Sequence, residues 1–320
     1  MQTPTFIQLH RIDDRAMADE AAAGLLAARA HVSPKFFYDP LGSRLFDAIT
    51  ELQEYYPTRT EAAIFEAHGA AIAEAALEAT GAGPVMVDLG AGNCAKAARL
   101  FGRLAPRRYV AVDISVDFLR DSLQHLQREH PAMQMVGVGL DFSAQLRLPE
   151  RLVDGRGLVF YPGSSIGNFS PTEALRLLRD ARATAAGGAL LIGVDLVKPV
   201  ATLEAAYDDE LGVTAAFNLN LLNHLNRLLG ADFRVRDWQH VAHFDTVHSR
   251  IQMHLQARHA VTAHWNGGQR EFAAGERIHT ENSAKWSVAG FEALLREAGF
   301  GAVRHWTDPQ GWFAVFLAAD

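Results

Sequence analysis

The sequence contains only one cysteine, Cys94, among its 320 residues. A single cysteine excludes an intrachain disulfide, and this scarcity is typical of proteins from a reducing compartment. The first residues, MQTPTFIQLHRIDDRAMADE, lack the apolar core of a signal peptide. No stretch approaches the run of about 18 apolar residues that spans a bilayer. We therefore expect a cytoplasmic protein, and the secreted and membrane-embedded classes are excluded.

The chain also lacks an excess of positive charge. It carries 30 lysines and arginines against 37 aspartates and glutamates, a formal net charge of −7. Such a balance disfavours nucleic acid and anionic membranes as partners. With 49% hydrophobic and 21% charged residues, the composition is that of a folded globular protein, which we expect to be a monomer. The length favours two folding units.

The middle of the chain alternates short apolar runs with amphipathic stretches. Near-continuous apolar runs of this kind predict buried parallel strands, and the stretches between them predict helices. The predicted strands lie in PVMVDLGAG, YVAVDIS, MQMVGVGLDF, GLVFYPGSSIGNF and GGALLIGVDLV. Near the C-terminus, one more helix and two strands flank the turn Asp308-Pro309-Gln310-Gly311. The pattern predicts an α/β fold with a mostly parallel, doubly wound sheet that ends in an antiparallel hairpin.

The segments around this alternation have a different texture. Helices are expected over residues 12–30, from near Asp47, and over 59–79. After Lys198-Pro199, residues 200–230 read as largely helical, and residues 248–258 alternate as a half-exposed strand does. We therefore divide the chain into one domain of residues 60–198 and 286–320 and a second, α+β domain of residues 1–59 and 199–285.

The glycines after the first apolar run predict a cofactor loop. A strand that ends in Gly90-x-Gly92 and leads into a helix lets the backbone approach a ligand closely. Asp113 follows the next strand, where an acidic side chain can accept hydrogen bonds from a ribose diol. A purely structural tight turn is the alternative, since a lone GxG is a weak signal.

Two nucleotide cofactors fit such a loop. NAD stays open because Ala95 is a tolerable third small residue. However, Asp88 precedes the glycines, where a carboxylate suits a positively charged ligand better than a pyrophosphate. Asp141 and Phe142 after the third strand offer an acceptor for an exocyclic amine and an aromatic face for adenine. These features favour the sulfonium cofactor S-adenosylmethionine. The predicted C-terminal hairpin, which follows a helix, also resembles that of methyltransferases that use this cofactor.

Three other segments carry polar groups among hydrophobic residues. They are a predicted turn that presents Tyr38, the loop from Gly163 to Asn168 after the fourth strand, and the segment IHTENSAKW, which contains Glu281 and Ser283. Each also has a structural interpretation: a packed tyrosine, an asparagine that stabilises its own turn, and a solvated glutamate.

These segments resemble a known family. FFYDPLGSRLFDAITELQEYYPTRTEAAI, DLGAGNCAK, FYPGSSIGNF, AYDDELGVTAAFNLNLL and IHTENSAKW are similar to segments of the L-histidine Nα-methyltransferases of ergothioneine biosynthesis, in the same order over nearly the whole chain. The resemblance implies a Rossmann-like class I methyltransferase domain with a second, substrate-binding domain. It also implies S-adenosylmethionine as cofactor, L-histidine as small-molecule substrate, and three methyl transfers that give hercynine.

The resemblance also implies roles for individual residues. On the cofactor side it implies Tyr55, Gly90, Lys96, Asp113, Asp141 and Phe142. On the substrate side it implies that Asn168 and Tyr207 hold the α-amino and carboxylate groups, and that Tyr38 contacts the amine as the catalytic residue. Glu281 and Ser283 would bind the imidazole, and Gly163, Thr214 and Met253 would line the same pocket.

Alternatives to this function belong to other classes. One is an oxidoreductase on the same sheet, and another is a non-catalytic family member that only binds cofactor. A third alternative stays within the family: an N-methyltransferase that acts on another amino acid or that adds fewer than three methyl groups. Retention of the substrate residues argues against the non-catalytic alternative.

The sequence is rich in histidine, with 14 in all. His240, His243, His248, His254, His259 and His264 cluster in one stretch, which suggests a metal site on a simple count. Zinc sites need converging ligands, commonly with a carboxylate or thiol among them. His259 does not share the strand face of His248 and His254, and no cysteine lies nearby, so we expect no metal.

Overall fold

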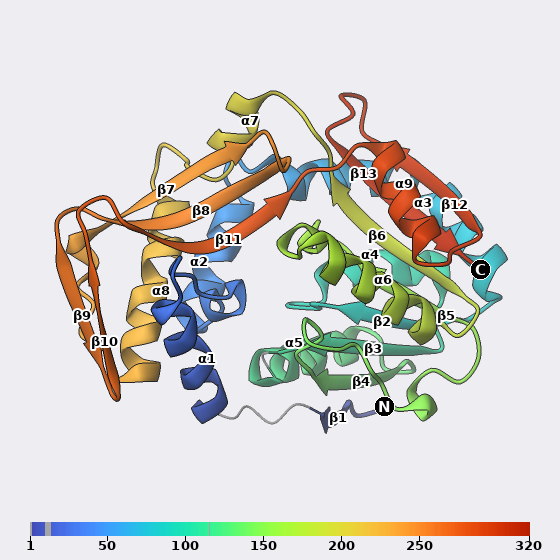
Figure 1. The fold of residues 1–320 in the computed structure, drawn as a ribbon. Coiled ribbons are helices and arrows are strands. Elements are labelled where there is room, and N and C mark those ends of the chain that lie inside the picture. The colour runs from blue at the N-terminus through green and yellow to red at the C-terminus, as the bar shows by residue number, and fades with distance from the viewer. Residues whose placement is uncertain (1, 10–13, 115) are drawn as a thin grey trace. The chain divides into compact units, whose positions relative to one another are not determined.

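The computed structural model of the chain describes residues 2–9, 14–114 and 116–320. The chain forms two compact units (Figure 1). Unit 1 comprises residues 1–11, 59–196 and 286–320, and unit 2 comprises residues 12–58 and 197–285. In the described part of the chain, no helix combines the length and apolar character needed to cross a membrane.

Unit 1 is built on an eight-stranded sheet in the order β1-β4-β3-β2-β5-β6-β13-β12. Its strands are β1 (Thr5–Gln8), β2 (Val85–Leu89), β3 (Arg108–Asp113), β4 (Gln134–Gly139), β5 (Gly157–Tyr161), β6 (Ala189–Asp195), β12 (Ala302–Thr307) and β13 (Phe313–Ala319). Strands β1 to β6 pair only in parallel with one another, whereas β13 runs antiparallel to both β6 and β12. The predicted mostly parallel sheet with a C-terminal antiparallel hairpin is confirmed.

Helices cover both faces of this sheet (Figure 1). Alternate residues of β2 serve the two faces: Val85 and Val87 join one core, and Met86 joins the other. The first core is completed by α6 (Pro171–Ala185) and α9 (Val288–Glu297), and the second by α3 (Tyr56–Thr80), α4 (Ala95–Leu104) and α5 (Val116–Glu129). Burial on both faces is why the strands are continuously apolar.

The strand order places the predicted cofactor residues at one edge of the sheet. Strand β2 pairs with β3 on one side and with β5 on the other, so the strand order reverses at β2 and β5. In open parallel sheets, ligands bind outside the carboxyl ends of the strands at such a reversal. Gly90 follows β2 and Gly163 follows β5, so both loops border this point.

Unit 2 combines helices with two small antiparallel sheets. Its helices include α1 (Asp14–Leu26), α2 (Pro40–Thr50), α7 (Val200–Ala205) and α8 (Val213–Leu229). One sheet has the order β11-β8-β7, and the other is the pair β10-β9. These strands are β7 (Trp238–Asp245), β8 (Arg250–Ala257), β9 (Val261–Trp265), β10 (Gly268–Phe272) and β11 (Arg277–Ala284).

Several details differ from the expectations. Residues 1–11 belong to unit 1, because β1 pairs in parallel with β4, whereas the sequence placed residues 1–59 together. The insert contains five strands rather than one. Helix α1 ends at Leu26, short of residue 30, and the start of the predicted helix at residues 12 and 13 lies outside the described residues.

The segment YDPLGS is the start of a helix and not the predicted turn. Pro40 begins α2, and the Asp39 side chain caps this helix by accepting a hydrogen bond from the Gly42 N–H at 2.7 Å. Proline at the first helical position after an acidic cap is a strong helix start, which outweighs its turn-like composition. The helix predicted from near Asp47 therefore begins seven residues earlier, at Pro40.

Candidate functional site

The glycine loop of unit 1 has the backbone that a cofactor loop requires. Gly90 and Gly92 adopt positive φ angles of 69° and 52°, a region that other residues rarely enter. The N–H of Gly92 donates to Oδ2 of Asp113 at 2.9 Å. The Asp113 carboxylate, which is predicted to contact a ribose, is thus held beside the glycine loop. The fold therefore brings these two predicted features together.

The adenine-side residues lie at the same edge, after β4. Asp141 accepts hydrogen bonds from the N–H and the hydroxyl of Ser143. The Phe142 ring meets Tyr161 edge-on at 5.8 Å and lies 3.9 Å from the position that a Cβ on Gly90 would occupy. Strands β2, β3 and β4 are adjacent and parallel, so their carboxyl ends lie at the same edge of the sheet. The residues at these ends are Gly90, Asp113, Asp141 and Phe142.

A buried glutamate that was not predicted from the sequence connects two loops at this edge of the sheet. Glu61 of α3 is 2% exposed, and its carboxylate accepts from Lys96 Nζ at 2.7 Å and from the Gly163 N–H at 2.8 Å. It therefore links two predicted ligand-binding residues, one on α4 and one after β5. No motif marks this residue in the sequence, because a glutamate in a long helix is usually solvated.

Asp88 does not face the ligand edge as expected. It is 2% exposed, and its Oδ2 accepts a hydrogen bond from the Tyr109 hydroxyl at 2.6 Å. Burial raises the Asp88 pKa to about 7. The expectation that its charge attracts a cationic cofactor is wrong, because strand alternation turns this side chain into the core with Met86. Cys94 is buried in the same core.

In unit 2, a chain of aromatic rings connects three of the predicted tyrosines. Tyr38 packs edge-on against Phe46 at 5.7 Å, Phe46 against Tyr55 at 6.2 Å, and Tyr55 against Tyr207 at 6.2 Å. Tyr38 also contacts Phe217 of α8 and remains 36% exposed. Tyr38 and Tyr207, at the two ends of this row of rings, are far apart in the sequence. The fold of unit 2 therefore brings together tyrosines whose proximity the sequence does not show.

Strand β11 carries the residues predicted to bind imidazole. Glu281 and Ser283 are two residues apart and so lie on one face of the sheet. Glu281 pairs with Met253 of β8 across the ladder, which brings a third predicted pocket residue alongside. The Ser283 hydroxyl lies 2.7 Å from the Tyr207 hydroxyl. The structure thus gathers Tyr207, Met253, Glu281 and Ser283 within unit 2.

Glu281 is a buried acid with a raised pKa. Its side chain is 8% exposed, and burial raises its pKa to about 7, an effect that Lys285 partly opposes. Within residues 2–9, 14–114 and 116–320, no side chain or backbone group hydrogen-bonds to its carboxylate. Buried carboxylates normally have partners, so this one is a candidate for a ligand contact.

The remaining predicted residues divide between the units. Thr214 lies in the first turn of α8, where its N–H donates to Asp209 at 2.8 Å. Asn168 ends the short 3₁₀ helix Ser165–Asn168 after β5. Gly163 and Asn168, expected on the substrate side, belong to unit 1, whereas Tyr55, expected on the cofactor side, belongs to unit 2.

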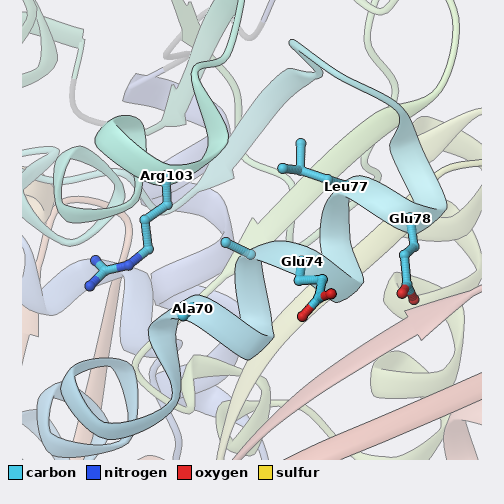
Figure 2. Close-up of a pocket in the computed structure, with 6 residues that line it drawn as sticks. Ala70, Glu74, Leu77, Glu78 and Arg103 are labelled. Atoms are coloured by element: carbon cyan, nitrogen blue, oxygen red, sulfur yellow. The ribbon is translucent and has the colours of Figure 1, made fainter.

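Figure 2 shows a pocket in unit 1 between the second half of α3 and Arg103 of α4. Its lining residues Ala70, Glu74, Leu77 and Glu78 include none of the predicted site residues. Among the residues that the structure describes, no group of three or more His, Cys, Asp or Glu side chains has the arrangement of a metal site.

Comparison with known proteins identifies the family. Residues 17–320 match the family model described as "Histidine-specific methyltransferase, SAM-dependent". The chain is 40% identical to the Histidine N-alpha-methyltransferase of Mycolicibacterium smegmatis over 311 residues, 95% of this chain and 94% of that protein. It is 39% identical to the Mycobacterium tuberculosis protein of the same name, over 95% of each chain.

A third relative is longer. The chain is 28% identical to "Ergothioneine biosynthesis protein 1" of Neurospora crassa over 278 residues, which are 84% of this chain and 31% of that protein. The family match covers both units and decides between the two nucleotide cofactors in favour of S-adenosylmethionine. The chain belongs to the S-adenosylmethionine-dependent, histidine-specific methyltransferase family.

Proposed function

We propose that this enzyme transfers three methyl groups from S-adenosylmethionine to the α-amino nitrogen of L-histidine, giving hercynine as a step of ergothioneine biosynthesis. The names of the mycobacterial relatives and of the Neurospora protein support the substrate and the pathway. The observation that carries the proposal is the buried, unpaired carboxylate of Glu281 beside the hydroxyl of Ser283.

Unit 1 is the proposed cofactor-binding unit. Its glycine loop leaves the backbone open at Gly90 and Gly92, and the Asp113 carboxylate lies at the loop, where it can accept from ribose hydroxyls. Asp141 and Phe142 would receive the adenine, and Lys96 the cofactor carboxylate; the family resemblance also assigns Tyr55 to the cofactor. When bound, S-adenosylmethionine supplies a methyl group made electrophilic by its sulfonium.

The substrate ring is proposed to bind in unit 2, on the face of β11. A neutral imidazole has one N–H donor and one acceptor nitrogen. The Glu281 carboxylate can accept from the N–H, and the Ser283 hydroxyl can donate to the other nitrogen. Because an unsatisfied buried group costs free energy, paired contacts of this kind reject side chains that lack the matching groups.

The amino-acid end requires orientation above all. In each transfer the lone pair of a neutral amine would attack the methyl carbon as the carbon–sulfur bond breaks, and S-adenosylhomocysteine would leave. After the first and second transfers the nitrogen loses a proton before the next attack, whereas the third transfer gives a quaternary nitrogen with no proton to lose. Holding the lone pair in line removes much of the entropic barrier. We assign this positioning to Tyr38 and Tyr207, with Thr214 and Met253 lining the pocket in unit 2. The family resemblance assigns Gly163 and Asn168 to the substrate as well.

The products formed over time test this function. Purified protein is incubated with histidine and excess S-adenosylmethionine, and the products are followed by mass spectrometry. We expect mono- and dimethylhistidine to appear first and to be converted to the trimethylated product. Accumulation of a mono- or dimethylated end product would favour the alternative in which the enzyme stops early, and methylation of another amino acid instead of histidine would favour a different substrate.

A further inference from the structure

Lys285 is a buried cation next to the proposed imidazole pocket. It follows β11 directly and is 3% exposed. Its Nζ donates to the Ser283 Oγ at 2.8 Å and to the Tyr207 hydroxyl at 3.0 Å, and it lies 4.8 Å from the centre of the Tyr207 ring. Lysine is rarely buried unless paired, so this arrangement calls for an explanation beyond the fold.

Hydrogen-bond accounting shows what the ammonium does to Ser283. An ammonium only donates, so Ser283 and Tyr207 both accept from Lys285. One of the two hydroxyls must also donate to the other across 2.7 Å. A phenol is more acidic than an alcohol and is the stronger donor, so Tyr207 donates to Ser283. Both lone pairs of Ser283 are then occupied, and its proton is directed to a third group.

The same charge acts on Glu281. Burial raises the pKa of Glu281, and the positive charge of Lys285 lowers it again. Other titratable groups around this part of unit 2 include Tyr207, His240, Asp208, Asp209 and Glu204. His240 donates from Nε2 to the Tyr207 carbonyl oxygen at 2.8 Å, and burial lowers the pKa of His240, so its ring stays neutral. Lys285 is therefore the cation that favours the carboxylate form.

We propose that Lys285 is a specificity-determining positioning residue, which makes Ser283 a hydrogen-bond donor and keeps Glu281 an acceptor. This inference rests on the proposed function and adds to it the reason for ring selectivity. The pocket then selects rings that present an acceptor nitrogen to Ser283 and an N–H to Glu281. Imidazole and 1,2,4-triazole meet both requirements, whereas thiazole lacks the N–H and phenyl lacks both groups.

The test compares histidine, triazolylalanine and thiazolylalanine as substrates of the wild-type enzyme and of Lys285→Met. We expect the wild type to prefer histidine over thiazolylalanine by about 100-fold or more in kcat/KM, in line with the selectivity of buried hydrogen-bonding sites. In Lys285→Met the preference falls to about tenfold or less, while the KM for S-adenosylmethionine changes by less than about twofold. The acid limb of the pH profile for histidine moves to higher pH, because Glu281 loses its stabilising cation.

Two further variants make the result decisive. Arg277→Met removes one positive charge from the exposed start of the same strand, and it should leave both the preference and the pH profile unchanged. Lys285→Gln keeps a donor toward Ser283 but loses the charge, so it should shift the pH profile as Lys285→Met does, while its preference for histidine over thiazolylalanine should fall less than in Lys285→Met. If Lys285→Met does not fold, Lys285→Gln gives the answer, and failure of both to fold would show a purely structural lysine.

Failure of this inference differs from failure of the proposed function. A wild-type enzyme that does not methylate histidine contradicts the function. A wild-type enzyme that does, with a folded Lys285→Met that keeps both the ring preference and the pH profile, contradicts only the role of Lys285.

Discussion

Glu281→Ala is expected to lower kcat/KM for histidine by about 1,000-fold while leaving the KM for S-adenosylmethionine within about threefold. The substitution removes the only proposed acceptor for the imidazole N–H, which would then be buried without a partner. The glycine loop, Asp113, Asp141 and Phe142, which we propose to hold the cofactor, lie in unit 1 and are not touched by the change. Steady-state kinetics with each substrate varied in turn measures both effects. An equal loss for histidine and cofactor would show that Glu281 has a structural role.

Glu281→Gln provides the matched control, because its amide oxygen still accepts a hydrogen bond. It should retain more activity than Glu281→Ala, and because glutamine does not titrate, comparison with wild type isolates the pH-dependent contribution of Glu281 to stability. The folded-state pKa of Glu281, about 7, lies above its ordinary value of 4.5. Its contribution to stability is therefore full below pH 4.5 and is lost as the pH rises through 7.

Replacing the glutamate by glutamine removes this loss. Urea titrations should show Glu281→Gln more stable than wild type at pH 8, by up to about 3 kcal/mol, and no more stable at pH 4. A variant that is more stable but less active would show that the carboxylate is kept for its ligand. Equal pH dependence in both proteins would contradict the buried state of Glu281.

Gly193→Ala is expected to produce the largest loss of stability. A Cβ on Gly193 would lie 2.0 Å from Oε1 of Glu61 and 3.0 Å from the Phe313 ring. The buried carboxylate would be displaced from Lys96 and Gly163, and overpacking of this kind costs about 1–3 kcal/mol before the lost hydrogen bonds are counted. We expect the melting temperature to fall by about 5–10 °C, with weaker binding of S-adenosylmethionine.

Gly102→Ala is the control for this substitution. Gly102 lies within α4, and a Cβ there would meet nothing within 4 Å. Alanine is the better helix former by about 1 kcal/mol, so Gly102→Ala should leave the melting temperature unchanged or raise it. Thermal unfolding and calorimetric titration with S-adenosylmethionine measure both variants. If Gly193→Ala unfolds and binds like Gly102→Ala, Glu61 does not organise the cofactor edge.

The sheet of unit 1 could be predicted because its signal is local. Each of its central strands is a continuous apolar run, and burial on both faces gives such a run only one common structure. The strand β1 escaped prediction, because a run of four residues, Thr5–Gln8, is too short to show a period. The strands of the insert escaped in part because half-exposed strands mix polar and apolar residues, as in His279 to Ser283.

Resemblance predicted several residues of the site, but the interactions among them could not be predicted from the sequence. Resemblance supplied Glu281 and Ser283, and the fold then brought Tyr207 against Ser283. Glu61 and Lys285 were not predicted, because their importance comes from burial and from partners distant in sequence, such as Gly163 and Tyr207. Asp88 was misassigned because the sequence does not tell which face of the sheet its side chain takes.

Competition among substrates tests the central claim most directly. The purified protein is given S-adenosylmethionine and an equimolar mixture of the standard amino acids, and methylated products are identified by mass spectrometry. We predict that histidine is the amino acid consumed and that it ends as the Nα-trimethylated betaine. Methylation of another amino acid with histidine left intact would contradict the proposed function.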